Sequence, residues 1–370
     1  MTRLNDLYDG VGQSPWIDNI RRDWLDDGTL ARYVHDGVRG VTSNPSIFAK
    51  ALATSTAYDA RVAGLNSEDP EWVFEHLAVD DVRDACDVLG TLHDASRADF
   101  SAGRRRYLDG FVSLEVSPRL AHDAPATIDA ARRLAAAVGR SNVMIKIPAT
   151  LAGLAAIPTV LGDGINVNVT LIFSIERYRA VMDAWASGLE LAIANGHDVA
   201  GIASVASFFV SRLDVAVDQL LDPGDPRRGT IAVAQVARAY AAYKEVVGGE
   251  RVMKLLASGA QVQRPLWAST STKNPAYDDL LYVDSIAANE TVNTMPDATL
   301  AAALDRGSYD QSVLRSDERM AAALATLDGL GSTLDLAAVT QRLEDEGVAA
   351  FIASYDELLE TVREKLRRRA

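Results

Sequence analysis

Eight short segments of the chain have a strand-like pattern of apolar and polar residues, and each is followed by a stretch with helical period. These segments are rich in β-branched and aromatic residues, which favours strands. We predict strands at residues 14–17, 40–43, 110–116, 142–148, 165–173, 201–209, 265–270 and 291–295. Strands that alternate with helices are typical of parallel βαβ units, and eight of them predict a closed (β/α)8 barrel, the TIM-barrel class of α/β fold.

Several residues mark where the intervening helices start and stop. Ser174 stands directly before a helical pattern and is a good N-cap, and we expect another helix to start at Asn274-Pro275. The pair Gly248-Gly249 is expected to end a helix, because glycine readily leaves the helical conformation.

Two parts of the chain are additional to the eight strand–helix units of a minimal barrel. Residues 67–106 have a long helical pattern and are expected to form an insertion between the second and third strands. The stretch from about residue 297 onward alternates apolar and charged residues at helical period and is expected to form extra helices outside the barrel. We therefore expect residues 1–370 to form one barrel domain with these additions.

The polar residues of the predicted strands fall on one face. Residues two apart on a strand point the same way, so Asn166, Asn168 and Thr170 share a face opposite β-branched neighbours. Ser113 and Glu115 share a face in the same way. The apolar face is expected to meet the helices and the polar face to line the barrel, near the carboxyl ends of the strands.

Two further strands follow this division. Thr42 and Asn44 share a face, and the first strand leads into Asp18. Polar groups inside a barrel cost roughly 1–3 kcal/mol each unless they are satisfied, so a function is one reason to keep them there. The alternative is that each is a satisfied core group or a helix cap, as Asn44 before Pro45 could be.

Lys146 is the most distinctive residue of this set, because large apolar residues flank it in a predicted strand. Burial disfavours the charged form of an amine, and a neutral amine attacks carbonyl groups, as Schiff-base catalysis requires. A structural ion pair with Glu115 is the alternative. Lys254 also has apolar flanks but belongs to an amphipathic helical pattern, so strand context is what separates the two lysines.

Composition narrows the classes of partner. The net charge of −14, from 37 basic and 51 acidic side chains, opposes binding to nucleic acid, and a phosphorylated substrate would need a local cationic pocket. The sequence has no apolar run of about 18 residues, so we expect no membrane segment. It has no signal-peptide pattern and only a single cysteine, so we expect a cytoplasmic protein. Its five histidines lack ligand-like spacing, so we expect no metal and no cofactor.

Four motifs, in order along the chain, together resemble those of transaldolase. They are TSNPSIF at 42–48, VSLEVSP at 112–118, MIKIPAT at 144–150 and NVNVTLIF at 166–173. The resemblance extends from Asp18 to at least Asn274. It implies a class I aldolase barrel that transfers a dihydroxyacetone unit between phosphorylated sugars in the pentose phosphate pathway. The sequence leaves open whether the protein is a monomer or a homodimer.

The resemblance also implies a role for each matching residue. Lys146 would form the Schiff base, and Asp18 would take the proton from the C4 hydroxyl as the C3–C4 bond breaks. Glu115 and Thr170 would hold the water that moves protons during carbinolamine formation and dehydration. The amides that would bind the hydroxyls of the three-carbon unit are those of Asn44 and Asn168.

The phosphate end matches the family only in part. In the segment SFFVSR at 207–212, Ser207 and Arg212 match residues that contact the substrate. Many members carry an arginine two residues after the serine that matches Ser269, whereas this chain has Ser271 there, as in a longer-chain bacterial branch. We expect Lys273 to supply the second positive charge, as a point charge rather than a bidentate fork. A satisfied serine-rich turn is the alternative for residues 269–272.

Two other functions remain as alternatives to transaldolase. One is a related Schiff-base aldolase that acts on fructose 6-phosphate and releases free dihydroxyacetone to water. The other is a non-catalytic barrel that acts as a binding or scaffold protein. A scaffold would be expected to lack the lysine or an acid, and this chain has both.

Overall fold

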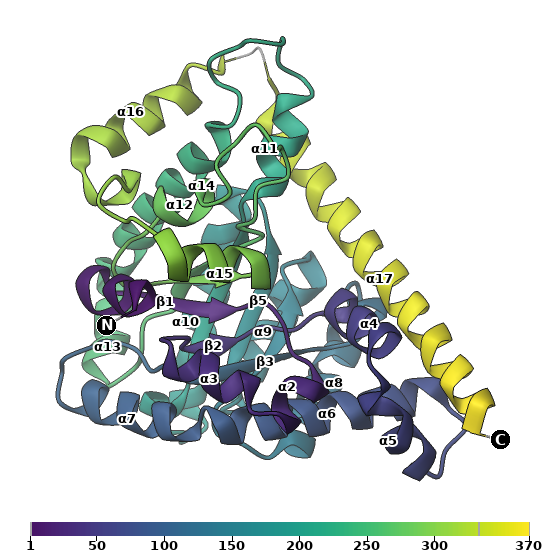
Figure 1. Cartoon of the computed structure of the whole chain (residues 1–370). Coiled ribbons are helices and arrows are strands. Elements are labelled where there is room, and N and C mark those ends of the chain that lie inside the picture. The colour runs from purple at the N-terminus through teal and green to yellow at the C-terminus, as the bar shows by residue number, and fades with distance from the viewer. Residues whose placement is uncertain (1, 332–333, 370) are drawn as a thin grey trace.

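In the computed structural model, which describes residues 2–331 and 334–369, eight parallel strands close into a barrel in chain order (Figure 1). β1 pairs with both β2 and β8, and this second pairing closes the barrel. The strands are β1 Gln13–Ile17, β2 Gly40–Val41, β3 Phe111–Glu115, β4 Val143–Pro148, β5 Val167–Ile172, β6 Ser204–Phe209, β7 Arg264–Ala268 and β8 Thr291–Met295. The predicted barrel is therefore confirmed, with each strand within three residues of its expected ends.

Helices surround this barrel and connect its strands. Their bounds are α1 Arg3–Asn5, α2 Arg22–Asp26, α3 Thr29–His35, α4 Pro45–Thr54, α5 Asp59–Gly64, α6 Pro70–Val88, α7 Gly90–Ser101, α8 Ala124–Val138, α9 Leu151–Gly162, α10 Ile175–Ala194, α11 Ser211–Asp218, α12 Ile231–Val247, α13 Glu250–Ala257, α14 Leu281–Asp284, α15 Asp297–Arg306, α16 Asp317–Asp328 and α17 Leu336–Arg369. Short turns of other helical types occur at Asp6–Val11, Thr56–Tyr58, Pro118–Leu120, Val199–Gly201 and Val313–Arg315. No helix in the described ranges is long and apolar enough to cross a membrane.

Two of the three expected helix signals are confirmed. The Ser174 side chain accepts a hydrogen bond from the Arg177 backbone N–H at the start of α10, and Gly248 caps the end of α12. The helix start expected at Asn274-Pro275 is wrong. The Asn274 side chain accepts from the Ala276 backbone N–H at 3.0 Å and closes a local turn, and α14 begins only at Leu281.

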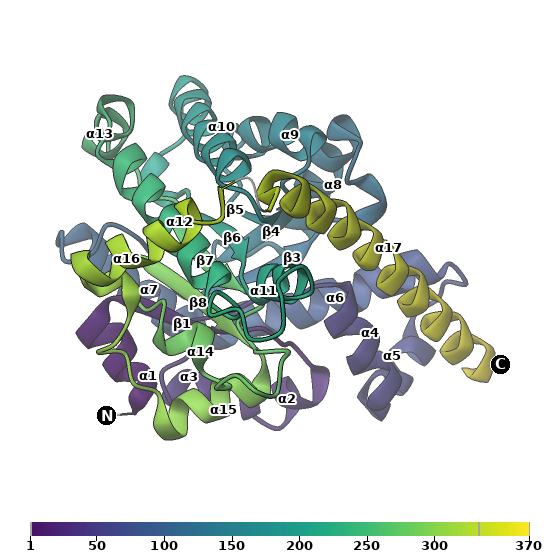
Figure 2. The ribbon, with the colours of Figure 1, turned by 90° about the horizontal axis from the view of Figure 1, so that it is seen from above.

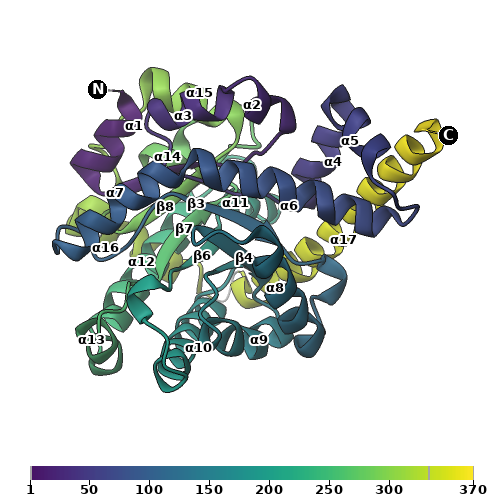
Figure 3. The ribbon, with the colours of Figure 1, turned by 90° about the horizontal axis from the view of Figure 1, so that it is seen from below.

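The segment at 67–106 forms α6 and α7, which lie between β2 and β3 in the chain. Figure 3 shows both helices running across the lower face of the molecule. α6 packs against β3 and α8. α6 also contacts α17 near its own start, where Glu71 accepts a hydrogen bond from Tyr355.

The C-terminal helices occupy two different places. α16 packs against α12 on the outside of the barrel, as expected for an added helix. α17 instead contacts α4, α5, α6 and α11, and Figure 2 shows it crossing the upper face of the molecule toward α4 and α5. The longest helix of the chain thus lies across the end of the barrel where the polar side chains gather.

The strand register brings the polar residues together. Glu115 of β3 is the register partner of Lys146 in β4, and Lys146 is in turn the partner of Asn168 in β5. The apolar residues between them, such as Ile145 and Ile147, are fully buried against the helices. The parity of each strand therefore aims the lysine, the carboxylate and the amide into the same interior.

Candidate active site

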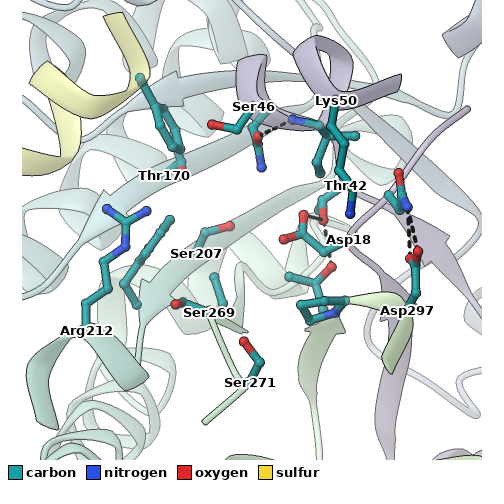
Figure 4. Close-up of a pocket in the computed structure, with 18 of the residues that line it drawn as sticks. Asp18, Thr42, Ser46, Lys50, Thr170, Ser207, Arg212, Ser269, Ser271 and Asp297 are labelled. Atoms are coloured by element: carbon teal, nitrogen blue, oxygen red, sulfur yellow. Dashed lines mark hydrogen bonds between the residues drawn. The ribbon is translucent and has the colours of Figure 1, made fainter. Parts of the chain in front are cut away.

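A cavity of about 590 Å³ opens at the carboxyl ends of the strands (Figure 4). Nine of the eleven residues expected from the sequence line it, namely Asp18, Asn44, Lys146, Thr170, Ser207, Arg212, Ser269, Ser271 and Lys273. The other two, Glu115 and Asn168, lie directly behind this lining and contact it through Lys146 and Ser207. The structure thus brings all eleven residues to one end of the barrel.

Lys146 occupies the floor of the cavity with its side chain only 5% exposed. Its Nζ donates to the backbone oxygen of Ser43 at 3.1 Å and lies 3.4 Å from Oε2 of Glu115. The ring of Phe351, from α17, has its centroid 5.8 Å from the same nitrogen. The amine is therefore held in one position between an acceptor, an acid and an aromatic ring.

Glu115 lies beside the amine and Thr170 lines the same cavity, and each has a buried oxygen without a hydrogen bond in the described part of the chain. Oε2 of Glu115 and Oγ1 of Thr170 are both buried, and neither has a hydrogen-bond partner among the described residues. Buried polar atoms are normally satisfied, so such atoms mark places where a ligand or water belongs. Burial raises the pKa of Glu115 to about 7, although the positive charge of Lys146 opposes the shift. The carboxyl group is thus able to exchange a proton near neutral pH.

Asp18 extends from the end of β1 into the cavity wall. Its Oδ1 accepts a hydrogen bond from the Thr42 hydroxyl at 2.6 Å, and Thr42 also contacts the hydroxyl of Thr294 at 2.6 Å. Burial raises the pKa of Asp18, while Lys146 and the Thr42 hydrogen bond oppose the increase. A carboxyl group fixed in this way suits proton transfer to a ligand in the cavity.

Asn44 lines the cavity, whereas Asn168 lies behind the lining with its amide nitrogen and oxygen both hydrogen-bonded to neighbouring side chains. Asn168 donates to the Ser113 hydroxyl at 3.0 Å and accepts from the Ser207 hydroxyl at 2.7 Å, so its orientation is fixed. The oxygen of Asn44 caps α4 by accepting from the Ile47 backbone N–H at 3.0 Å. Asn44 is therefore a helix cap and a cavity residue at once, with its amide hydrogens available to a ligand.

A second set of residues makes one side of the cavity cationic. Arg212, the second residue of α11, stacks on the Phe209 ring with its guanidinium carbon 5.1 Å from the centroid. Lys273 donates to the Ser271 hydroxyl at 2.6 Å. Burial lowers the pKa of both cations, and for Lys273 the charge of Arg212 lowers it further. Neither cation forms an ion pair with a carboxylate of the described chain, so together they favour an anion.

The backbone at the cavity is locally strained. Leu171 has φ 59° and Ser269 has φ 58°, values that non-glycine residues rarely adopt. Leu171 follows Thr170 at a register irregularity in β5, and the Ser269 hydroxyl contacts that of Ser211 at 2.9 Å. Strained residues of this kind gather at functional sites, where their surroundings hold them in place.

Some residues of the cavity were not predicted from the sequence. Ser46 and Lys50 lie four residues apart in α4, and both line the cavity, with Lys50 opposite Arg212 in Figure 4. Their spacing was a usable signal, because residues four apart share a helix face. Asn19 donates to both carboxylate oxygens of Asp297 at 2.9 Å at the cavity rim. Phe351 had no local signal, since its helix lies far along the chain from the barrel strands.

Comparison with known proteins gives a consistent result. The family described as Transaldolase/Fructose-6-phosphate aldolase matches residues 15–362. The transaldolase of Saccharopolyspora erythraea is 47% identical over 366 residues, covering 96% of each chain. That of Mycolicibacterium smegmatis is 48% identical over 365 residues, covering 96% of this chain and 95% of its own. Transaldolase 1 of Streptomyces avermitilis is 48% identical over 376 residues, covering 99% and 96% respectively.

Proposed function

This chain belongs to the transaldolase/fructose-6-phosphate aldolase family, and we propose that it is a transaldolase. It transfers a dihydroxyacetone unit reversibly from sedoheptulose 7-phosphate to glyceraldehyde 3-phosphate, giving erythrose 4-phosphate and fructose 6-phosphate in the pentose phosphate pathway. The observation that carries the proposal is the buried amine of Lys146, 3.4 Å from the Glu115 carboxylate, on the floor of a cavity with a cationic side.

The first step is attack of the Lys146 amine on the ketone carbon of the donor sugar. The resulting carbinolamine loses water to give an iminium ion. Glu115 and Thr170 hold the water that carries protons to and from the carbinolamine oxygen, which would account for the absence of a hydrogen bond from the described residues to their buried oxygens. A carboxyl group with a pKa of about 7 suits this task, because it gives and takes a proton with similar ease at neutral pH.

The second step is cleavage of the bond between C3 and C4. Asp18 takes the proton from the C4 hydroxyl, the C3–C4 electron pair moves into the iminium, and the aldose product leaves a three-carbon enamine on Lys146. The acceptor aldehyde then reverses this step, and Asp18 returns the proton to the new hydroxyl. Because the iminium accepts the electrons of the breaking bond, the proposed reaction requires no metal.

The remaining residues bind and orient the substrate. Asn44, Asn168 and Ser207 hydrogen-bond the hydroxyl groups of the three-carbon unit. The phosphate lies against Arg212 and Lys273, with Ser269 and Ser271 as neutral donors. In a chain of net charge −14, this local concentration of positive charge gives a phosphorylated sugar a favourable site.

Reductive trapping tests the proposal. Borohydride added with fructose 6-phosphate reduces the iminium to a stable secondary amine, and peptide mass mapping locates it. We expect a single adduct on Lys146 and none on Lys254, an exposed lysine of α13. No adduct, or an adduct at any other residue, would contradict the proposed function.

An aldolase that releases free dihydroxyacetone is the second candidate, because the family includes both activities. A coupled assay with and without the acceptor aldehyde separates the two. A transferase shows little turnover without acceptor, whereas an aldolase turns over at a similar rate in both conditions. The three relatives, each named a transaldolase and covered almost end to end, support the transferase.

A further inference from the structure

α17 places an aromatic ring at the reacting amine from a remote part of the chain. Phe351 lines the cavity, is 4% exposed and has its ring centroid 5.8 Å from Nζ of Lys146. Val348, Tyr355 and Leu358 are also buried and repeat at intervals of three or four residues, so they share a helix face with Phe351. The face of α17 that meets the barrel therefore presents Phe351 to the catalytic centre.

Contacts on both sides of Phe351 fix the helix in this position. Before it, Glu344 receives two hydrogen bonds from Arg177 of α10, at 3.1 and 3.2 Å. After it, Ser354 accepts from the Ser46 hydroxyl of α4 at 2.8 Å, and Tyr355 donates to Glu71 of α6 at 2.9 Å. Three different helices of the barrel thus hold α17, which makes it a fixed cover rather than a loosely attached one.

We propose that Phe351 is a specificity-determining residue that keeps water away from the three-carbon enamine on Lys146. This inference rests on the proposed transaldolase function. A transferase must preserve the enamine until the acceptor aldehyde arrives, and the buried ring of Phe351 shields the side of the amine that faces α17. Exclusion of water is a recognised way to protect a reactive intermediate from side reactions.

The side reaction that Phe351 suppresses consumes one water molecule overall. A proton from solvent adds to the enamine carbon and gives an iminium ion. Water then adds to the iminium carbon and loses a proton, the C–N bond breaks, and dihydroxyacetone leaves as the amine is regenerated. In transfer, the same enamine carbon instead forms its bond to the acceptor aldehyde.

The experiment compares Phe351→Ala with Ile352→Ala, a matched truncation at the next residue, which is partly buried but does not line the cavity. The measured quantity is the ratio of dihydroxyacetone release without acceptor to transfer with acceptor, using fructose 6-phosphate as donor. We expect Phe351→Ala to raise this ratio at least about tenfold and Ile352→Ala to leave it near the wild-type value. Borohydride trapping in each variant checks that the Schiff base still forms.

The outcomes separate this inference from the proposed function. If the wild type forms no adduct, the proposed function fails. If the adduct forms and the wild type transfers, but Phe351→Ala keeps the wild-type ratio, only the role of Phe351 fails. An equal rise of the release-to-transfer ratio in both variants would assign the effect to general loosening of α17 and would also overturn the proposed role of Phe351. Should Phe351→Ala not fold, Phe351→Leu carries the same test with a smaller expected rise.

Discussion

The two ends of the barrel each enclose a buried ion pair, and the two pairs differ in how completely they are satisfied. At the amino ends of the strands, Arg264 lies 2.9 Å from Asp109 and also donates to the Ser14 hydroxyl at 2.6 Å. Its guanidinium stacks on Tyr107 at 3.9 Å, and Ser14 in turn donates to Asp109 at 2.7 Å. Both charged groups are thus enclosed in a closed network of partners.

At the carboxyl ends of the strands, the pair of Lys146 and Glu115 is longer, at 3.4 Å, and Oε2 of Glu115 has no hydrogen bond among the described residues. A buried pair with complete hydrogen bonding suits a structural role, because loss of either partner would cost free energy. A buried pair with unused hydrogen-bonding capacity has room for a ligand. Both pairs are buried and they differ in partner saturation, which is the difference that fits the reactive role proposed for Lys146 and Glu115.

Removal of the Lys146 amine should lower the transfer rate more than any other change considered below. We expect Lys146→Met to lower the transfer rate by at least about 10⁴-fold, because the covalent intermediate cannot form. The folded state should persist, since Glu115, with its raised pKa, accepts a proton instead of remaining an unpaired charge. Steady-state assays and thermal unfolding check the two parts. A residual rate within about 100-fold of the wild type would show that another group does the chemistry.

Breaking the opposite pair should affect stability instead. Asp109→Asn leaves the charge of Arg264 buried without its carboxylate, and we expect a loss of about 3–5 kcal/mol in the free energy of unfolding in urea. The kcat of the folded fraction should stay within about twofold of the wild type, because the network lies away from the cavity. The double change Asp109→Leu with Arg264→Met should recover much of the stability. A large fall in kcat without loss of stability would contradict the structural role.

Glu115→Gln tests the reactive pair more finely. We expect kcat to fall about 10²-fold, because the amide cannot exchange protons. The carboxyl has a pKa of about 7 in the folded chain and an ordinary value of 4.5, so folding retains a proton that the unfolded chain loses. Stability contributed by the protonated group is therefore present below about pH 4.5 and lost as pH rises to about 7. Across this pH range, the free energy of unfolding should decline more steeply in the wild type than in the variant. Equal slopes would contradict the raised pKa of Glu115.

Substitution on the phosphate side of the cavity should change the kinetics least. We expect Lys273→Ala to raise the KM for phosphorylated donors about tenfold, with little change in kcat, because it removes one charge-assisted contact. Free dihydroxyacetone as donor should show no such change. Lys254→Ala is the matched control, since Lys254 is exposed and pairs with Glu250 at 2.7 Å. An unchanged KM for phosphorylated sugars would remove Lys273 from the phosphate site.

Much of the fold and the floor of the site followed from strand parity. A period of two puts Glu115, Lys146 and Asn168 on the inward face of their strands, and the register of the structure shows that they are direct neighbours. The same reasoning could not find the carbonyl of Ser43 as the acceptor for Lys146, because backbone groups carry no sequence signal. It also could not assess hydrogen-bond saturation, which depends on the three-dimensional positions of all neighbours.

The failures have physical causes in longer-range contacts. Asn274-Pro275 has the local chemistry of a helix start, but the Tyr277 hydroxyl donates to Asp218 at 2.5 Å and fixes the segment as a turn beside α11. Phe351 belongs to a helix whose amphipathic pattern shows that one face is buried without showing what it covers. Tertiary packing decides both cases, and neither is encoded within a short window.

The position of α17 has a consequence for the newly made protein. All eight strands precede residue 296, so the barrel can close before the covering helix leaves the ribosome. A nascent barrel that closes at that stage would have its lysine in place and its site not yet covered by α17. The order of synthesis therefore allows the site to form before the helix that covers it.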